Sequence, residues 1–395
     1  MKLVILTHCP PLPSWGGAMT FYRHFIQRPE FEVMVFSPAG ESVETECDLG
    51  YELKSFDRPN LWRRLCHTRF SKWIHAFEML YGGVFLPRKV IKEAKLFKPD
   101  AVFTVAGSWD WTALAAQKLA YELRVPLIAS FNDWYDYGSF LAHERFRKSI
   151  ELRFRLFYQQ ADLALCTCEG MQASLGEHRN VHIWYPTGAP VPSESDPYTP
   201  TIANADRPLT VFFGGSLGDW YGPMLEALVT YCREFEPSVC FKIFGALETW
   251  SDEFDQWARD AGVFGGRVSF EDLGLRAAEA DLLILPMGFG EECAQVERTS
   301  FKTKFLDYLS FQRPILVWGP EYCSAVKVAR EFDSAECVLE EDVVECASTI
   351  ARLASDPKRR QKLIGNARRM YEGRFHPDLI HQKLVDRVSA LVEDY

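Results

Sequence analysis

Four polar side chains gather on one side of a predicted helix within the stretch 280–320. At about 100° per residue these are Ser300, Thr303, Lys304 and Asp307, and the opposite side is apolar. Ser300 is a good N-cap, so Lys304 is expected near the positive end of the helix dipole, where a cation costs about 0.3–1 kcal/mol. A bound anion removes that conflict, because the free N–H groups of a first helical turn attract negative charge. The pattern therefore predicts a phosphate site. The alternative is a solvated lysine on an ordinary amphipathic helix.

Two short apolar runs flank this helix, at Leu282–Leu285 and Pro314–Trp318. Such unbroken runs are typical of parallel strands that are buried on both faces. A helix that follows such a strand is a common phosphate site in α/β proteins. Lys302 points to another side of the helix, so it is the weaker phosphate candidate.

The run SFKTKFLDYLSFQRPILVWGP, residues 300–320, resembles a signature of family-4-type retaining glycosyltransferases of the GT-B fold, S-x-P-T/S-K-L-x-E-Y-L-A-x-G-R-P-I-L. The matching residues are Ser300, Thr303, Lys304, Tyr308, Arg313, Pro314, Gly319 and Pro320. Lys302, Asp307 and Gln312 depart from it, standing for the usual Pro, Glu and Gly. The resemblance implies that Lys304 contacts the donor diphosphate and that Asp307 holds the ribose hydroxyls.

The same resemblance implies further site residues. Gly16–Gly17 and Gly215–Ser216 match glycine turns that relatives place against the donor phosphates, although a glycine pair by itself is usually a turn. Asn132 stands where relatives often carry a histidine, and it is expected to position a hydroxyl because an amide cannot act as a base. Many relatives also have a Glu at the position of Thr299, and a basic pair after the second glycine turn. Both are absent from this chain.

Composition excludes several classes of protein. The chain has 395 residues, which predicts two or three domains, and its net charge of -10 argues against nucleic acid as the main partner. The 11 cysteines are scattered without a CxxC spacing, so no metal is expected and a reduced cytosol fits best. No stretch reaches the roughly 18 apolar residues of a membrane span.

Alternating strand and helix patterns predict an α/β protein with parallel sheets, divided by a proline-rich linker at 186–208. The resemblance implies two Rossmann-like domains facing a cleft, with 1–186 as the acceptor domain and 207–375 as the donor-nucleotide domain. Within the second domain, Arg267–Phe270 is predicted to be a strand. The resemblance implies that a last helix, in 376–395, crosses back to the first domain.

Two basic segments carry interleaved aromatic residues. Residues 58–98 hold ten Lys or Arg against two Glu, and a second basic run occupies 144–157. This mixture suits a membrane surface or an acidic acceptor. Two amphipathic helices whose aromatic residues face the core explain it equally well.

Two rival functions are kept open. Residues 214–218 fit G-x-S-x-G, the nucleophile elbow of a hydrolase, with Ser216 as nucleophile and His376 or His381 as partner. Against this, 219–223 is predicted to be loop, whereas the elbow helix starts at the serine. The other rival is a catalytically inactive sugar-nucleotide-binding protein, suggested by the missing Glu and basic pair.

The favoured interpretation is the one that the resemblance implies: a retaining glycosyltransferase that moves a sugar from a nucleoside diphosphate sugar, with UDP or GDP, to an acceptor hydroxyl. The expected setting is polysaccharide or glycolipid synthesis in the cytoplasm, with peripheral association at the inner face of a membrane. The resemblance implies no cofactor and no metal. A glycan or a lipid-linked molecule is the expected acceptor.

Overall fold

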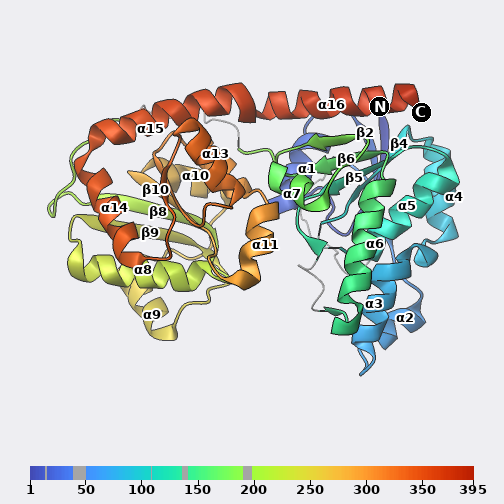
Figure 1. The fold of residues 1–395 in the computed structure, drawn as a ribbon, viewed down its shortest axis with the longest axis horizontal. Helices are drawn as coiled ribbons and strands as arrows, with labels where there is room; N and C mark the ends of the chain where they lie inside the picture. Colours follow the sequence, from blue (N-terminus) through green and yellow to red (C-terminus); the bar gives the residue numbers. More distant parts are fainter. Residues whose placement is uncertain (14–15, 39–49, 108, 136–140, 190–197) are drawn as a thin grey trace. The chain divides into compact units, whose positions relative to one another are not determined.

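The computed structural model describes residues 1–395 except 14–15, 39–49, 108, 136–140 and 190–197. Contacts divide the chain into two compact units (Figure 1). The first comprises Met1–Thr187, Thr299–Phe301 and Asp378–Tyr395, and the second comprises Gly188–Arg298 and Lys302–Pro377. Residues 14–15, directly before the predicted glycine turn at Gly16–Gly17, and residues 190–197 of the predicted linker lie outside the described residues.

The first unit is built on a parallel sheet of seven described strands in the order β3-β2-β1-β4-β5-β6-β7. β4 and β5 are buried along their whole length, because helices cover both faces of a parallel sheet. The strands are β1 (Lys2–Leu6), β2 (Glu32–Pro38), β3 (Leu53–Phe56), β4 (Ala101–Val105), β5 (Leu127–Phe131), β6 (Leu163–Cys166) and β7 (Val181–Ile183). The helices are α1 (Gly16–Phe25), α2 (Asn60–Leu65), α3 (Ser71–Tyr81), η1 (Gly82–Phe85), α4 (Arg88–Phe97), α5 (Trp111–Leu123), η3 (Glu144–Phe146), α6 (Arg147–Gln160), α7 (Glu169–Leu175) and α16 (Pro377–Asp394).

The second unit has a parallel sheet of five described strands in the order β12-β11-β10-β8-β9. The strands are β8 (Leu209–Ser216), β9 (Val239–Ala246), β10 (Leu282–Pro286), β11 (Ile315–Trp318) and β12 (Glu336–Val338). The helices are α8 (Tyr221–Phe235), α9 (Asp252–Asp260), α10 (Phe270–Ala278), α11 (Glu291–Thr299), α12 (Thr303–Ser310), α13 (Ser324–Phe332), α14 (Val343–Ser355), α15 (Pro357–Met370) and η4 (Tyr371–Phe375). Two parallel α/β sheets were predicted from the sequence, and both are confirmed.

The predicted strand at Arg267–Phe270 is wrong. Residues 265–269 have no regular secondary structure, and α10 begins at Phe270. Ser269 caps this helix, since its hydroxyl accepts a hydrogen bond from the Asp272 N–H at 3.0 Å. Capping by a serine with acidic residues in the first turn favours the helix over a short strand.

The last helix, α16, packs within the first unit through one apolar stripe. Ile380, Leu384 and Val388 are buried at a spacing of four residues, whereas Leu379 is exposed. His381 lies beside this stripe, with its Nδ1 atom 3.2 Å from Nδ1 of His24 on α1. Its Nε2 atom lies 3.1 Å from the Glu30 carboxylate.

We expect Leu384→Ala to lower the free energy of unfolding by about 2–5 kcal/mol, because it leaves a cavity against the first unit. The matched variant Leu379→Ala removes the same atoms from an exposed site of the same helix and is expected to change it by less than about 0.5 kcal/mol. Urea unfolding of both variants is the measurement. Equal effects of the two substitutions would contradict the packing of α16.

Candidate functional site

Lys304 occupies the second position of α12, which follows β10 through α11 and a short turn. The predicted N-cap at Ser300 is wrong: Lys302 is the N-cap residue, and no side chain caps the helix. Ser300 precedes the helix by three residues and instead donates a hydrogen bond from Oγ to the Asp133 carboxylate, at 2.8 Å within the first unit. The first N–H groups of α12 therefore have no side-chain cap, and Lys304 stays at the positive end of the helix.

The Lys304 side chain lies over the end of β8. Its Nζ atom is 4.0 Å from the ring centre of Phe213 and 4.5 Å from that of Tyr221. A Cβ atom at Gly215 would come within 2.5 Å of the same Nζ, and the φ of +144° at this residue strains any other residue type. Burial, with Lys302 nearby, lowers the pKa of Lys304 to about 7. An anion bound beside this amine would favour its charged form.

Other predicted donor residues converge on the same end of the second unit. Ser216 ends β8 directly after Gly215, and Thr303 opens α12 beside Lys304. Asp307 lies one turn further along α12 and accepts a hydrogen bond from the Ala189 N–H at 2.8 Å. One carboxylate oxygen of Asp307 thus anchors the linker, and its role toward a ribose stays a prediction.

Glu297 was missed by the sequence reasoning because its spacing from Asp307 does not fit the family pattern. Its side chain is fully buried, with one oxygen 3.4 Å from Lys302 Nζ and the other accepting from the Gly288 N–H at 3.3 Å. Burial raises the pKa of Glu297, although Lys302 and Gly288 oppose this. Lys302 is thus engaged by a carboxylate, which supports the lower rank given to it as a phosphate ligand. The sequence did offer a signal for this pair, because the acidic Glu297 and the basic Lys302 stand on either side of the break between α11 and α12.

The remaining predicted site residues belong to the first unit. Gly16 and Gly17 open α1, and Gly16 has a φ of +60°. Asn132 follows β5 and accepts a hydrogen bond from Ser130 Oγ at 2.5 Å. A Cβ at Gly107 would lie 2.7 Å from the Asp133 backbone nitrogen, so the loops after β4 and β5 are in close contact. The roles given to these residues stay predictions.

The structure gives no support to a nucleophile elbow at Ser216. That serine is the last residue of β8, and α8 begins only at Tyr221, with Asp219 at a φ of +55° between them. Ser216 Oγ accepts a hydrogen bond from the Gly218 N–H at 3.3 Å. An elbow requires the helix to start at the serine, which presents the hydroxyl on a sharp turn.

Two polar residues at the carboxyl edge of the first sheet were also missed. His8 follows β1, Asp110 follows β4, and His8 Nδ1 lies 3.6 Å from Asp110 Oδ1. Polar residues that follow neighbouring parallel strands meet at one edge of the sheet. The positions of His8 after β1 and of Asp110 after β4 were therefore the sequence signal that could have found this pair.

One group of side chains in the described residues has the ligand types of a metal site: Cys66, His75 and Glu78. Glu78 is buried and bonded at 2.6 Å to Arg58, whose guanidinium also lies 3.9 Å from Cys66 Sγ. The cluster is therefore explained by an Arg–Glu ion pair, which supplies the compensating positive charge.

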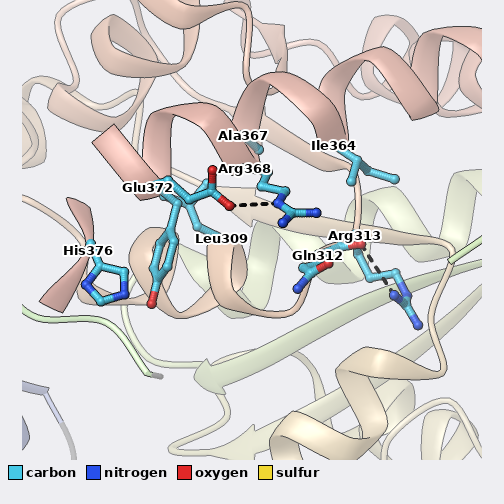
Figure 2. Close-up of a pocket in the computed structure, with 9 residues that line it drawn as sticks. Leu309, Gln312, Arg313, Ile364, Ala367, Arg368, Glu372 and His376 are labelled. Carbon is cyan, nitrogen blue, oxygen red and sulfur yellow. Dashed lines mark hydrogen bonds and ion pairs between the residues drawn. The ribbon is translucent and has the colours of Figure 1, made fainter. Parts of the chain in front are cut away.

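Two cavities accompany these sites. Figure 2 shows one of about 260 Å³ between α12, α15 and η4, where Arg368 pairs with Glu372 at 2.7 Å. The other, of about 500 Å³, lies at the ends of β2 and β3 and contains the Lys54–Glu93 ion pair. Neither is lined by a residue that the sequence assigned to the donor site.

Residues 18–187 match the model of Glycosyltransferase Family 4. The Anabaena protein HepE, solved in complex with UDP, is similar at a TM-score of 0.64 and 16% identity over 99% of this chain and 100% of HepE. Sucrose-phosphate synthase from Thermosynechococcus elongatus is similar at a TM-score of 0.65 and 13% identity, over 100% of this chain and 99% of the synthase. A trehalose 6-phosphate synthase from Burkholderia multivorans is similar at a TM-score of 0.62 and 11% identity, over 100% of this chain and 97% of that synthase. No curated protein matches the sequence significantly.

The fold is GT-B. The resemblance to GT-B glycosyltransferases that the sequence predicted is confirmed by the Family 4 match and by these structures. The Family 4 match lies within the first unit, whereas the signature at 300–320 lies mostly in the second. No helix in the described part of this GT-B chain is both long and apolar enough to cross a membrane.

We expect pyrophosphate to bind at Lys304 with uptake of a proton above pH 7. An anion favours the charged amine and raises a pKa that is about 7 in the empty site, so proton uptake should vanish near pH 6 and binding should weaken at higher pH. Titration calorimetry in buffers of different ionisation enthalpy measures the uptake. Lys304→Ala is expected to abolish it and to weaken binding by about 1.5–3 kcal/mol.

The matched variant is Lys302→Ala. It leaves the buried Glu297 carboxylate without this ion pair, so it is expected to lower the melting temperature more than the affinity. If Lys302→Ala weakened pyrophosphate binding more than Lys304→Ala, the assignment of the anion to Lys304 would be wrong.

Proposed function

We propose that this chain is a retaining glycosyltransferase that transfers a sugar from a nucleoside diphosphate sugar to an acceptor hydroxyl, without a bound metal. The observation that carries the proposal is Lys304, whose amine stands at the N-terminus of α12 over the glycine turn at Gly215. UDP is the favoured nucleotide, since HepE was solved with UDP and with UDP and glucose. Polysaccharide or glycolipid synthesis is the proposed setting.

The chemistry follows from where charge develops. As the sugar leaves, negative charge grows on the diphosphate, and a fixed cation with free helix N–H groups stabilises that charge more in the transition state than in the ground state. A half-buried amine near aromatic rings acts more strongly than an exposed one, because water screens it less. Lys304 therefore supplies the positive charge for which other enzymes use a metal ion.

The test is a thermal-shift screen of sugar nucleotides, followed by calorimetry on the best binder with and without a chelator. We expect a UDP-sugar to give the largest shift, binding to survive the chelator, and slow hydrolysis of that donor in the absence of acceptor. The anomeric configuration of the released sugar, read by NMR, tests retention. Binding without any hydrolysis would favour an inactive sugar-nucleotide-binding protein. No binding of any nucleotide would refute the proposal.

We also propose a cytoplasmic location with peripheral binding to the inner face of a membrane, through the region formed by α2, α3 and the start of α6. α3 and α6 lie side by side (Figure 1), and the Trp73 ring contacts His143 and Phe146 at 5.1 and 5.2 Å. Parts of the predicted basic segments 58–98 and 144–157 thus lie side by side, where α3 meets α6. The exposed residues of this region combine apolar and basic side chains: Leu61, Phe70, Trp73, Arg69, Lys72, Arg145, Arg147 and Lys148.

Some aromatic residues of this region face the core, and others are exposed where they could meet a membrane surface. The Trp62 ring stacks on Phe77 at 5.0 Å and meets the buried Phe85 edge-on at 5.1 Å, so these three rings serve the core. Phe70 is 50% exposed and Trp73 is 46% exposed, beside the basic residues. The exposed pair, with the neighbouring cations, is the combination that anionic lipid surfaces attract.

We expect the protein to bind vesicles that contain anionic lipid, to release them at high salt, and not to bind neutral vesicles. Phe70→Ala should weaken this binding by roughly tenfold, since burying an aromatic ring contributes about 1.5–3 kcal/mol. Phe235→Ala is the control, because Phe235 is similarly exposed, at 55%, on α8 of the second unit. Equal losses in both variants, or equal binding to neutral vesicles, would exclude this surface.

A further inference from the structure

Two buried histidines join α1 to α16 within the first unit. His24 has no exposed surface, and His381 is 2% exposed. Their rings are nearly parallel, at 19°, and the two Nδ1 atoms lie 3.2 Å apart. The outer nitrogens also have partners, since Nε2 of His24 contacts the Thr187 hydroxyl and Nε2 of His381 lies 3.1 Å from the Glu30 carboxylate. The side chains therefore form one continuous polar chain from Thr187 to Glu30.

Only one arrangement of protons satisfies this chain while both rings are neutral. The charged Glu30 carboxylate can only accept, so Nε2 of His381 carries the proton and Nδ1 of the same ring accepts. Nδ1 of His24 must then donate, which leaves its Nε2 atom to accept from the Thr187 hydroxyl. Every donor faces an acceptor, so the docked position of α16 is matched to two neutral imidazoles.

Added protons disturb this match. One extra proton still leaves a donor opposite an acceptor between the rings, but it places a charge on a ring without contact with water. A second extra proton sets two N–H groups against each other across the 3.2 Å contact. Two charged imidazoles are therefore incompatible with the docked position of α16.

The charged groups that face the pair lie in α1, after α1 and in α16: Arg23, Arg28, Glu30 and Asp378. Burial lowers the pKa of His24 well below its ordinary value, and the neighbouring ring and the two arginines lower it further. Burial also lowers the pKa of His381, although the two carboxylates oppose this effect. Burial raises the pKa of Glu30, but hydrogen bonds from its own N–H and from the imidazole outweigh burial and keep that pKa below its ordinary value.

The same cluster holds two boundary segments of the first unit. Thr187 is the last residue of that unit before Gly188 begins the second, and Asp378 follows the second unit's last residue. Arg23 donates to the Thr187 carbonyl oxygen at 2.5 Å, and Arg28 donates to the Asp378 carboxylate at 2.6 Å. Whatever loosens this cluster thus loosens the start of α16 and the end of the first segment together.

We propose that the His24–His381 pair is a proton-operated latch, which holds the start of α16 on the first unit while both rings are neutral and releases it when they are protonated. Released rings regain an ordinary pKa near 6.5, so below that pH the released state binds more protons than the docked state. Each ring then favours release by up to about tenfold per pH unit. The latch is closed at neutral pH and opens as the pH falls.

A third histidine near α16 must be separated from this pair. His182 lies on β7, and burial lowers its pKa, with Arg387 and Lys383 of α16 acting in the same direction. His178 is a matched control away from α16, because burial lowers its pKa too, but its Nε2 atom lies 3.1 Å from the Ala161 carbonyl oxygen. Glutamine is the substitution of choice, since its amide offers a donor and an acceptor, as neutral imidazole does, but does not titrate.

Hydrogen exchange of the full chain at pH 7.5 and pH 5.5, followed by mass spectrometry, tests the latch. We expect the protection factors of α16 to fall by roughly 10- to 100-fold at the lower pH, while those of α8 in the second unit stay unchanged. The double variant His24→Gln, His381→Gln should keep its α16 protection at pH 5.5. His182→Gln and His178→Gln should lose protection as the wild type does.

Three outcomes of this experiment would overturn the proposal. They are constant α16 protection in the wild type, an equal loss of protection in α8, and an equal loss of α16 protection in the double variant. If His182→Gln abolished the pH effect, β7 rather than the pair would carry it, and the proposal would be wrong.

Nitrogen-15 NMR of the histidine rings in the wild type needs no variant to fold. We expect the proton on Nδ1 of His24 and on Nε2 of His381 at pH 7.5, and protonation of the pair together with the loss of α16 protection. The opposite tautomers would contradict the latch. So would a pair that takes up both protons near pH 6.5 while α16 stays protected.

Discussion

The carboxyl edge of the second sheet depends on one constraint, the placement of the Lys304 amine over Phe213 and Tyr221. A cation at a helix N-terminus is unfavourable, and burial makes it more so, which is why the pKa of Lys304 falls to about 7. The backbone must leave room for the amine, and only glycine at 215 does so. Tyr308 fixes the register of helix and strand, since its hydroxyl accepts from the Gly214 N–H at 3.1 Å. The unit thus places an amine where its charged form is disfavoured by burial and by the helix N-terminus.

Both units present their chemistry at the carboxyl edges of parallel sheets. In the first unit, His8, Asp110 and Asn132 follow three adjacent strands, β1, β4 and β5. In the second unit, Gly215 and Ser216 end β8, next to β10. Parallel strands orient all their following loops to one edge, so polar residues that are distant in sequence become neighbours there.

Two buried ion pairs show how the same residue types serve stability. Glu78 is bonded to Arg58 in the first unit, and Glu297 is paired with Lys302 in the second. Each carboxylate is nearly inaccessible to water, so removal of its cation leaves an uncompensated charge. In the second unit this leaves two neighbouring lysines with different tasks. Lys302 neutralises a buried acid, whereas Lys304 faces the glycine turn.

The amino-acid sequence by itself determined the two α/β units, most strands and the place of Lys304 in the first turn of a helix. These features depend on local patterns: apolar runs of four to six residues, helical spacing, and residues that follow a strand. The sequence also indicated the two basic aromatic segments, but not which aromatic rings serve the core. It misplaced the start of α12 by assigning the N-cap to Ser300, and it took Arg267–Phe270 for a strand.

Tertiary structure alone decided the partners. Ser300 bonds Asp133, Lys302 pairs with Glu297, and His8 faces Asp110 across two neighbouring strands. The first and third of these pairs join residues more than 100 positions apart, and the second spans a break between helices. No periodicity within a short window reports such pairs, because strand order and helix packing bring them together. Burial then sets which of their charges persist, and burial is a property of the folded chain.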